Sequence, residues 1–271
     1  MSAAQTPAQL GHGGISPTQI ARSFGQAAAR YDDFADLQRD VADHLLASIA
    51  ITRVDTALDL GCGTGYCTRK LGARFPQAHL IALDLALPML HATAMRAPQG
   101  THLLCADMQA VPLRDASADL AVSSLTLQWC TDPRRVFADL ARMLRPGGQA
   151  LISTFGPATL RELHAAWRAA DAHVHANRFL DAGVLQAAAE SVGLTIRLEQ
   201  ESKVRYYASL RALAQELKGI GAHNMNSGRA RGLTAPAAFA RAEQAFSNNS
   251  VLGQGVPVTW ELYYLDLRKP A

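Results

Sequence analysis

The sequence has no long apolar run. No stretch approaches the about 20 consecutive apolar residues of a membrane-spanning helix, and the first residues lack the basic and then apolar segments typical of a secretion signal. These absences argue against an integral membrane protein and against export. We therefore expect a cytoplasmic protein with no membrane partner.

Cysteine is scarce, and metal-ligand patterns are missing. Nine histidines are present, but none belongs to an H-E-x-x-H pattern, and His173 and His175 would diverge on a helix because they are two residues apart. We predict no metal site. The cysteines lack both C-x-x-C spacing and the density of a disulfide scaffold, which predicts reduced thiols. These four residues are Cys62, Cys67, Cys105 and Cys130.

A large excess of charge of one sign is also absent. The formal net charge is +3 and charged residues make up 18% of the chain, so the composition does not indicate a nucleic-acid partner. Hydrophobic residues make up 49%, and much of this share is alanine, which favours helices. The 271 residues suffice for one large α/β domain or for a core domain with an insertion.

The most informative stretch is T-A-L-D-L-G-C-G-T-G at residues 56–65. A short apolar run ends in glycines at alternate positions, which predicts a buried strand that turns into a loop at the start of a helix. Glycine suits such a loop because it tolerates positive φ and has no Cβ to hold a ligand away from the backbone. Asp59 is an acid in a segment otherwise suited to burial. Its carboxylate therefore either accepts a hydrogen bond within its own turn or binds a ligand.

Short apolar runs alternate with helical segments up to residue 155. Pro76 and the R-P-G-G sequence at 145–148 are strong stop signals. The alternation predicts parallel pairing with right-handed crossovers, hence an α/β fold with a doubly wound sheet. We expect strands at 57–60, 79–83, 102–106, 120–125 and 150–155, and helices at 66–75, 87–95 and 133–144.

The rhythm changes beyond residue 156. Helical patterns at 160–171 and 181–191 precede a strand at 194–198, and the last β-prone run is 258–267. The loop G-I-G-A-H-N-M-N-S-G-R-A-R-G is long for a connector, which favours a binding role. We divide the chain into a disordered tail (1–16), an N-terminal helical lid (17–53), an α/β core (54–202), a helical cap (203–255) and a final core strand (256–271).

Three of the expected strands have an acid at their carboxyl ends. Asp59, Asp84 and Asp107 should meet at one sheet edge, where doubly wound folds bind ligands. Asp84 lies about twenty residues beyond the glycines, where an acid can accept hydrogen bonds from ribose hydroxyls. Asp107 could meet an adenine amine. Each acid alone could equally be a helix cap or a solvated strand end. A dinucleotide site would need G-x-G-x-x-G, which the G-C-G-T-G sequence lacks.

These motifs, with A-D-M at 106–108 and L-R-P-G-G at 144–148, resemble the class I S-adenosylmethionine-dependent methyltransferases over residues 54–155. The resemblance implies a mostly parallel seven-stranded sheet with an antiparallel last strand. It also implies S-adenosyl-L-methionine as cofactor and S-adenosyl-L-homocysteine as product. The cofactor-binding residues it implies are Asp59, Gly61, Cys62, Gly63, Gly65, Asp84, Leu85, Asp107, Met108 and Ser124.

The segments outside this core point to an acceptor. F-G-Q-A-A-A-R-Y-D-D-F-A-D-L-Q at the N-terminal side, S-S-L-T-L-Q-W-C, H-A-N-R-F-L at 175–180 and L-K-G-I-G-A-H-N at 217–224 are similar to the malonyl-acyl-carrier-protein O-methyltransferases of biotin synthesis. The likeness runs from residue 24 to residue 269. It implies methylation of the free carboxylate of a malonyl thioester on an acidic acyl-carrier protein or on coenzyme A. Separately from the resemblance, we expect a monomer that binds no nucleic acid.

The resemblance also suggests which residues act on the acceptor. Tyr31 and Gln38 lie in the lid, which covers the cofactor in related methyltransferases, and Gln128 and Trp129 follow the fourth strand. A carboxylate in a dry pocket needs a cation, for which Arg178 is the first choice and Lys218 and Arg205 are alternatives. A basic face for the carrier protein is expected at Arg211, Lys218, Arg229 and Arg231.

A carboxylate is ionised at neutral pH, because its reference pKa is about 4, so the reaction requires no general base. Catalysis must then come chiefly from alignment and exclusion of water. Two alternatives stay open at this point. The acceptor could be another small carboxylate or a quinone precursor, or the chain could be a cofactor-binding regulator without turnover.

Overall fold

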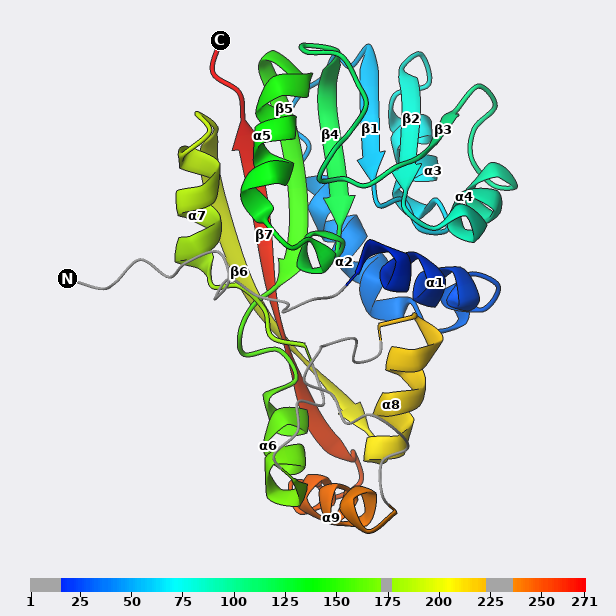
Figure 1. Cartoon of the computed structure of the whole chain (residues 1–271), viewed down its shortest axis with the longest axis vertical. Helices are drawn as coiled ribbons and strands as arrows, with labels where there is room; N and C mark the ends of the chain where they lie inside the picture. The colour runs from blue at the N-terminus through cyan, green and yellow to red at the C-terminus, as the bar shows by residue number, and fades with distance from the viewer. Residues whose placement is uncertain (1–15, 172–176, 223–235) are drawn as a thin grey trace, which may run out of the picture.

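The central feature of the computed structural model, which describes residues 16–171, 177–222 and 236–271, is one twisted sheet (Figure 1). Seven strands in the described part follow the order β3-β2-β1-β4-β5-β7-β6. Their bounds are β1 Thr56–Leu60, β2 His79–Asp84, β3 His102–Cys105, β4 Ala118–Ser124, β5 Leu144–Phe155, β6 Thr195–Tyr207 and β7 Val256–Arg268.

The strand directions confirm the predicted topology. The pairs β1–β2, β2–β3, β1–β4 and β4–β5 are parallel, whereas β7 runs antiparallel to both β5 and β6. β1 is central, and Leu58 is fully buried between its neighbours. A parallel strand covered on both faces is largely apolar, which explains the apolar residues on either side of Asp59 in this strand.

Helices cover both faces of the sheet. α2 (Asp36–Ala47) and α3 (Tyr66–Arg74) share one core with the sheet, while α5 (Pro133–Met143) and α7 (Ala182–Glu190) share the other. α4 (Leu87–Ala94) packs beside β2 and β3. Two of these helices, α5 and α7, begin at an aspartate N-cap. The Asp132 carboxylate accepts a hydrogen bond from the Arg134 amide at 3.0 Å, and the Asp181 carboxylate accepts one from the Val184 amide at 3.2 Å.

The lid crosses the end of the sheet at which β1 and β2 finish. It contains α1 (Pro17–Ala27), the short 3-10 helix η2 (Tyr31–Asp33) and α2. Figure 1 shows α1 beneath the points of the β1 and β2 arrows, above α8 (Leu210–Gly219). The N-terminal segment therefore lies between the sheet edge and the helices of the cap.

The strand expected at 194–198 is longer than predicted. β6 continues to Tyr207, past the boundary expected at residue 202, so that β6 and β7 form a ribbon that extends well beyond the sheet (Figure 1). α6 (Arg161–Ala170), assigned above to the core, packs on α9 (Pro236–Ser247) at the far end of this ribbon. The Glu162 carboxylate fastens α6 to β7, because it accepts hydrogen bonds from the Thr259 amide at 2.9 Å and the Thr259 hydroxyl at 2.6 Å.

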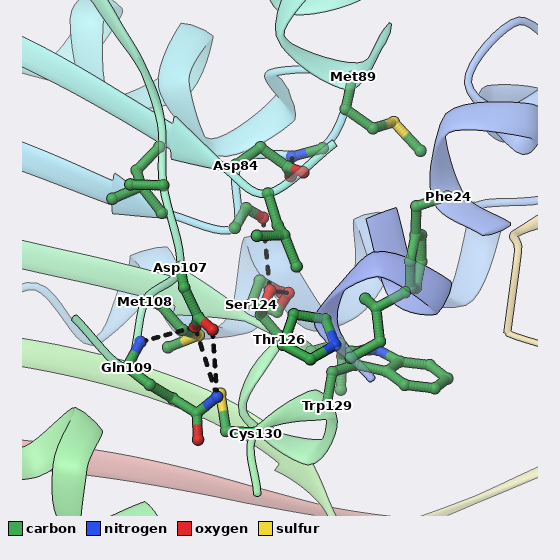
Figure 2. A pocket seen from close by; sticks show the side chains of 18 of the residues that line it. Phe24, Asp84, Met89, Asp107, Met108, Gln109, Ser124, Thr126, Trp129 and Cys130 are labelled. Atoms are coloured by element: carbon green, nitrogen blue, oxygen red, sulfur yellow. Dashed lines mark hydrogen bonds between the residues drawn. The ribbon is translucent and has the colours of Figure 1, made fainter. Parts of the chain in front are cut away.

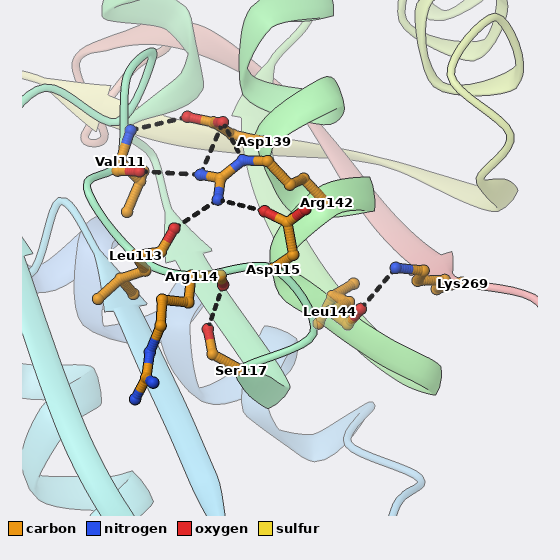
Figure 3. Close-up of polar contacts among 9 residues, drawn as sticks. All are labelled: Val111, Leu113, Arg114, Asp115, Ser117, Asp139, Arg142, Leu144 and Lys269. Carbon is orange, nitrogen blue, oxygen red and sulfur yellow. Dashed lines mark hydrogen bonds and ion pairs between the residues drawn. The ribbon is translucent and has the colours of Figure 1, made fainter.

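The long connection between β3 and β4 is held by one arginine of α5 (Figure 3). The Arg142 guanidinium donates to the carbonyls of Val111, at 2.9 Å, and Leu113, and it pairs with Asp139 at 3.0 Å and Asp115 at 3.1 Å. The Asp139 carboxylate also accepts a hydrogen bond from the Val111 amide at 2.7 Å. These contacts fix the loop that follows β3, which forms one side of the site described below.

No helix in residues 16–171, 177–222 and 236–271 is long and apolar enough to cross a membrane. The same residues contain no group of three or more His, Cys, Asp or Glu side chains arranged to hold a metal ion. Each of the four cysteines is a free thiol, and Cys105 is the exposed one.

Candidate functional site

The glycine loop after β1 is locked to the end of β2. The amides of Gly61 and Cys62 both donate to the Leu83 carbonyl, at 2.7 and 2.9 Å, and the Gly63 amide donates to the Asp84 carboxylate at 2.9 Å. Gly61 and Gly63 have φ of +75° and +56°, values that residues with a Cβ adopt only with strain. The predicted turn is therefore present, and Asp84 is one of its anchors.

A cavity of about 770 Å³, here called the Asp84 cavity, lies beside this loop (Figure 2). Asp84 and Asp107 supply carboxylates to it, while Phe24, Met89 and Trp129 supply apolar walls. The cavity thus combines two carboxylates with apolar walls. Its other lining residues include Ile20, Gly61, Gly63, Leu85, Met108, Gln109, Ser124, Thr126 and Cys130.

Both carboxylates of the Asp84 cavity are held in place. The two Asp84 oxygens accept hydrogen bonds from the amides of Gly63, at 2.9 Å, and Ala86, at 2.8 Å, and burial raises the pKa of this carboxyl. The Asp107 carboxylate accepts a hydrogen bond from the Gln109 amide at 2.9 Å, shown in Figure 2. Because a carboxylate oxygen has more than one lone pair, each acid can still accept a hydrogen bond from a ligand.

A second cavity of about 460 Å³, the Asp59 cavity, shares Gly61 and Gly63 of the glycine loop with the first. Asp59 is only 2% exposed; it accepts a hydrogen bond from the Thr68 hydroxyl at 2.5 Å, and burial raises its pKa to about 7. Arg39 lines the same cavity from α2, with its guanidinium donating to the Asp32 carbonyl at 2.9 Å and pairing with Asp36. Because a carboxylate and a guanidinium lie in one cavity, it can bind a ligand that carries both a cationic and an anionic group.

A third cavity of about 610 Å³, the Trp260 cavity, opens between lid, sheet and cap. Its described lining contains no acid, amine, guanidinium, imidazole or thiol. The Gln128 amide is fixed there, because it donates to the Leu125 carbonyl at 2.7 Å and accepts from the Thr154 hydroxyl at 3.2 Å. The lining residues are Phe24, Tyr31, Gln38, Leu125, Gln128, Trp129, Phe155, Leu160, Asn177, Phe179, Leu217, Ile220, Ala222 and Trp260.

Tyr31 lies where the three cavities meet. Of the residues that the structure describes, it alone lines all three. Burial raises the pKa of its phenol, and the charges of Asp84 and Asp32 raise it further, so the phenol stays neutral. Gln38 lines the Asp59 and Trp260 cavities, and its amide oxygen is buried with no hydrogen-bond partner in the described part of the chain. These two lid residues mark the junction between the cavities.

Two residues of the Trp260 cavity have backbone strain. Leu125 has φ of +49° and Leu160 has φ of +58°, in the left-handed region that residues other than glycine rarely adopt. Such conformations persist only where the surrounding structure imposes them, and they concentrate at functional sites. Both leucines belong to the loops that follow β4 and β5, at the sheet edge where ligands bind in doubly wound folds.

The structure brings most of the predicted cofactor residues together. Nine of the ten line the Asp84 or Asp59 cavity, and the tenth, Gly65, lines neither. Gly65 instead precedes α3 with φ of +83°, and a Cβ there would lie 3.0 Å from the Thr93 side chain. Its requirement for glycine is thus explained by helix packing.

The three predicted partners for a substrate carboxylate lie outside the described lining of the Trp260 cavity. Arg178 and Lys218 are exposed, whereas Asn177 and Phe179, on either side of Arg178, line the cavity. Arg178 is absent from the cavity lining although both of its neighbours belong to it. Arg205, the other alternative, pairs with Glu216 at 3.4 Å. Arg229 and Arg231 lie outside the described residues.

Several lining residues were not predicted. Arg39 lacked a signal, because nothing in the sequence distinguishes it from a solvated helix arginine. Gln109 could have been found two residues after Asp107; its amide oxygen accepts hydrogen bonds from the Thr131 amide at 3.0 Å and the Asp132 amide at 3.2 Å. It therefore joins the loop after β3 to the start of α5.

Comparison with known proteins agrees with this arrangement. A family model described as a methyltransferase domain matches residues 58–152. A Cellvibrio japonicus protein described as biotin biosynthesis bifunctional protein BioHC is 42% identical, over 94% of this chain and 51% of that protein. The Teredinibacter turnerae protein of the same description is 41% identical, over 93% and 47%. This chain thus spans about half the length of these curated relatives.

Among solved structures, the YcgJ protein from Bacillus subtilis superposes with a TM-score of 0.61 at 15% identity, over 86% of this chain and 99% of that one, and so shares the fold. A Hahella chejuensis protein described as malonyl-[acyl-carrier protein] O-methyltransferase is 38% identical over 93% of this chain and 91% of its own length. This chain therefore belongs to the malonyl-[acyl-carrier protein] O-methyltransferase family.

Proposed function

We propose that the chain methylates the free carboxylate of a malonyl thioester, using S-adenosyl-L-methionine, as an early step of biotin synthesis. When bound, the cofactor supplies a methyl group on a sulfonium centre. The observation that carries the proposal is the Trp260 cavity, which meets both cofactor-type cavities at Tyr31 and contains no described side chain that could act as a base.

The residues of the Asp84 and Asp59 cavities fit this cofactor. The Asp84 carboxylate can accept hydrogen bonds from ribose hydroxyls, and Asp107 and Gln109 can bind the adenine edge. Asp59 can pair with the α-ammonium group, and Arg39 can pair with the α-carboxylate. The apolar walls formed by Met89, Met108 and Trp129 suit the two faces of a planar adenine ring.

The chemistry of the Trp260 cavity favours a carboxylate as acceptor. A hydroxyl or carbon acid would have to lose a proton, but Tyr31 is a poor base because burial favours its neutral phenol. A carboxylate arrives ionised. The described lining holds no cation to pair with it, so the Tyr31 hydroxyl and the Gln38 amide N–H groups can bind it instead by donating hydrogen bonds at the junction. Trp129 and Phe24, whose rings lie 5.2 Å apart edge to face, exclude water.

The exposed cations of the cap suit an acidic carrier. Lys218 and Arg211 lie on α8, and Arg178 lies on the segment that forms one wall of the Trp260 cavity. We propose that these side chains bind the carrier protein at the mouth of the cavity. Because these side chains are exposed, their electrostatic attraction for the carrier protein should weaken as the salt concentration rises.

The test is transfer of a labelled methyl group to malonyl-acyl-carrier protein, with malonyl-coenzyme A, a free small carboxylate and a quinone precursor as competing acceptors. We expect a methyl ester on the malonyl thioester and S-adenosylhomocysteine in equal amount. Acetyl-acyl-carrier protein, which lacks the free carboxylate, is the matched negative control. Calorimetric binding of the cofactor with no labelled product from any thioester would refute the proposal and favour a regulator.

A further inference from the structure

The lid is fastened to the cofactor side of the molecule through Asp32. Its carboxylate accepts a hydrogen bond from the Thr64 hydroxyl of the glycine loop at 2.7 Å, and it forms an ion pair with Arg96, just after α4. Arg39 holds the carbonyl of the same residue at 2.9 Å. The residue directly before Asp32 is Tyr31, so these contacts determine where the Tyr31 side chain lies.

The same lid rests on the cap at two glycines. A Cβ on Gly219, the last residue of α8, would lie 2.4 Å from the Phe34 ring. Gly221 has φ of +73°, and its Cβ would lie 3.2 Å from the α1 backbone. The buried Ser23 hydroxyl of α1 donates to the Gly221 carbonyl at 2.9 Å. The G-I-G sequence is therefore the seat on which the lid packs.

The two contact regions belong to different cavities. Asp32 and Thr64 line the Asp59 cavity, whereas Ile220, between the two glycines, lines the Trp260 cavity. The effect of an Asp32 substitution on the acceptor is therefore the one that tests coupling. Phe24 and Tyr31, between the two fastening points, line the Asp84 cavity as well as the Trp260 cavity. A displacement of the lid must therefore change both the cofactor cavities and the acceptor cavity.

We infer that the lid couples the two binding sites: Asp32 is a positioning residue that holds it on the cofactor side, and Gly219 and Gly221 form its seat on the acceptor side. The acceptor half of this inference rests on the proposed function. The Asp32 and Arg96 side chains are 39% and 46% exposed, so this contact can open without disrupting the core. Coupling between sites is reciprocal, so each fastening point should affect the ligand on the other side.

The experiment uses the full chain and three variants. Asp32→Asn weakens the cofactor-side contact, Gly219→Ala disturbs the seat, and Asp33→Asn is the control, because Asp33 is an exposed neighbour whose partner is Arg30, at 3.7 Å on the surface. Affinity for S-adenosylhomocysteine is measured by calorimetry without acceptor. The KM for malonyl-acyl-carrier protein is measured at saturating cofactor, and Tm is recorded for each protein.

We expect Gly219→Ala, which lies outside both cofactor cavities, to weaken S-adenosylhomocysteine binding roughly 5-fold or more. Asp32→Asn should also weaken that binding and should raise the acceptor KM by a similar factor, with little change in Tm. Asp33→Asn should change none of these quantities. Combining Gly219→Ala with Phe34→Leu, which removes the ring in the way, should restore much of the cofactor affinity.

Unchanged S-adenosylhomocysteine affinity in folded Gly219→Ala would overturn the coupling. If that variant does not fold, Ser23→Ala removes the hydroxyl that donates to the Gly221 carbonyl and decides the same question. The cofactor measurements need no acceptor, so they test the coupling even if no malonyl thioester is methylated. Conversely, wild-type methylation with independent cofactor and acceptor effects would refute the coupling and leave the proposed function intact.

Discussion

The Thr68 hydroxyl donates a hydrogen bond of 2.5 Å to the Asp59 carboxylate, at a position where Asp59 is 2% exposed. This bond lowers the pKa of the acid, but burial is the larger effect and raises it to about 7, with a further rise from the charge of Asp84. A buried carboxyl with such a pKa changes its charge near neutral pH. Its interaction with a cationic ligand must then depend on pH.

Cofactor affinity should fall as the pH drops below about 7. Binding of an α-ammonium group favours ionised Asp59, and below its pKa this carboxylate must first lose a proton. We expect the Kd for S-adenosylhomocysteine to rise by up to about tenfold per pH unit between pH 7 and pH 5.5. Asp59→Asn should bind more weakly at pH 8 and lose most of this slope. Calorimetry across this pH range measures the Kd of both proteins. An equal pH dependence in the variant would mean that another group causes it.

The ligand-free protein should show the opposite trend in stability from this residue. The folded-state pKa of Asp59 is above its reference value of 3.8, so between about pH 4 and pH 7 the folded state binds more protons than the unfolded state. The Asp59 contribution to the free energy of unfolding therefore falls as pH rises through this window, and it is constant above it. Denaturant titrations give the free energy of unfolding of wild type and Asp59→Asn at pH 5 and pH 8. The change between the two pH values should differ between the two proteins by the Asp59 contribution.

The acids of the Asp84 and Asp59 cavities could be predicted from the sequence because they lie at the carboxyl ends of parallel strands. Strand order 3-2-1 makes the ends of β1, β2 and β3 neighbours, and periodicity alone was enough to locate those ends. The orientation of Arg178 could not be predicted in this way. Whether Arg178 or Asn177 faces the cavity depends on how residues 177–179 pack against the β6–β7 ribbon, a contact between parts distant in sequence.

The length of β6 was missed for a related reason. The sequence E-Q-E-S-K-V-R-Y-Y at 199–207 has no apolar face, and such a face is the usual sign of a strand. In the structure the ribbon is partly covered by charged pairs: Lys203 lies 3.7 Å from Glu201, and Arg205 lies 3.4 Å from Glu216 of α8. A strand stabilised by pairing with β7 and by ion pairs carries little hydrophobic periodicity.

Two neighbouring glycines should respond differently to alanine. Both have positive φ, so each substitution should cost about 1–2 kcal/mol of backbone strain. At Gly61 the new Cβ would also lie 2.3 Å from the Thr126 side chain, whereas at Gly63 no atom lies within 4 Å. Gly61→Ala should therefore lower Tm more. Gly63→Ala should fold but place a methyl group in the cofactor cavities and raise the cofactor Kd roughly tenfold or more. Thermal unfolding and calorimetry separate the two; equal Tm values would contradict this account.

The exposed cations of the cap should act on the carrier and not on the cofactor. Arg178→Ala and Lys218→Ala should each raise the KM for malonyl-acyl-carrier protein a few-fold, and the rise should shrink at high salt because screening weakens surface charge pairs. Cofactor affinity should be unchanged. Arg53→Ala is the matched control, since Arg53 is an exposed arginine whose side chain is 90% exposed and which precedes β1 at the opposite end of that strand. A loss of cofactor binding in Arg178→Ala would contradict its placement outside the cavities.

Gln38 should show a trade between stability and activity. Its amide oxygen is buried and has no hydrogen-bond partner among the described residues, a state that typically costs about 1–3 kcal/mol. Gln38→Met keeps the size of the side chain and removes this cost, so the ligand-free variant should unfold at a higher temperature, by roughly 2–4 °C per kcal/mol recovered. If the amide holds the acceptor carboxylate at the junction of the cavities, kcat/KM for malonyl-acyl-carrier protein should fall at least tenfold.

Gln244→Met is the control for the substitution itself. Gln244 is an exposed residue of α9 whose side chain has a hydrogen-bond partner, Asn248, at 3.1 Å. A more stable variant with full activity would show that Gln38 has no part in binding the acceptor.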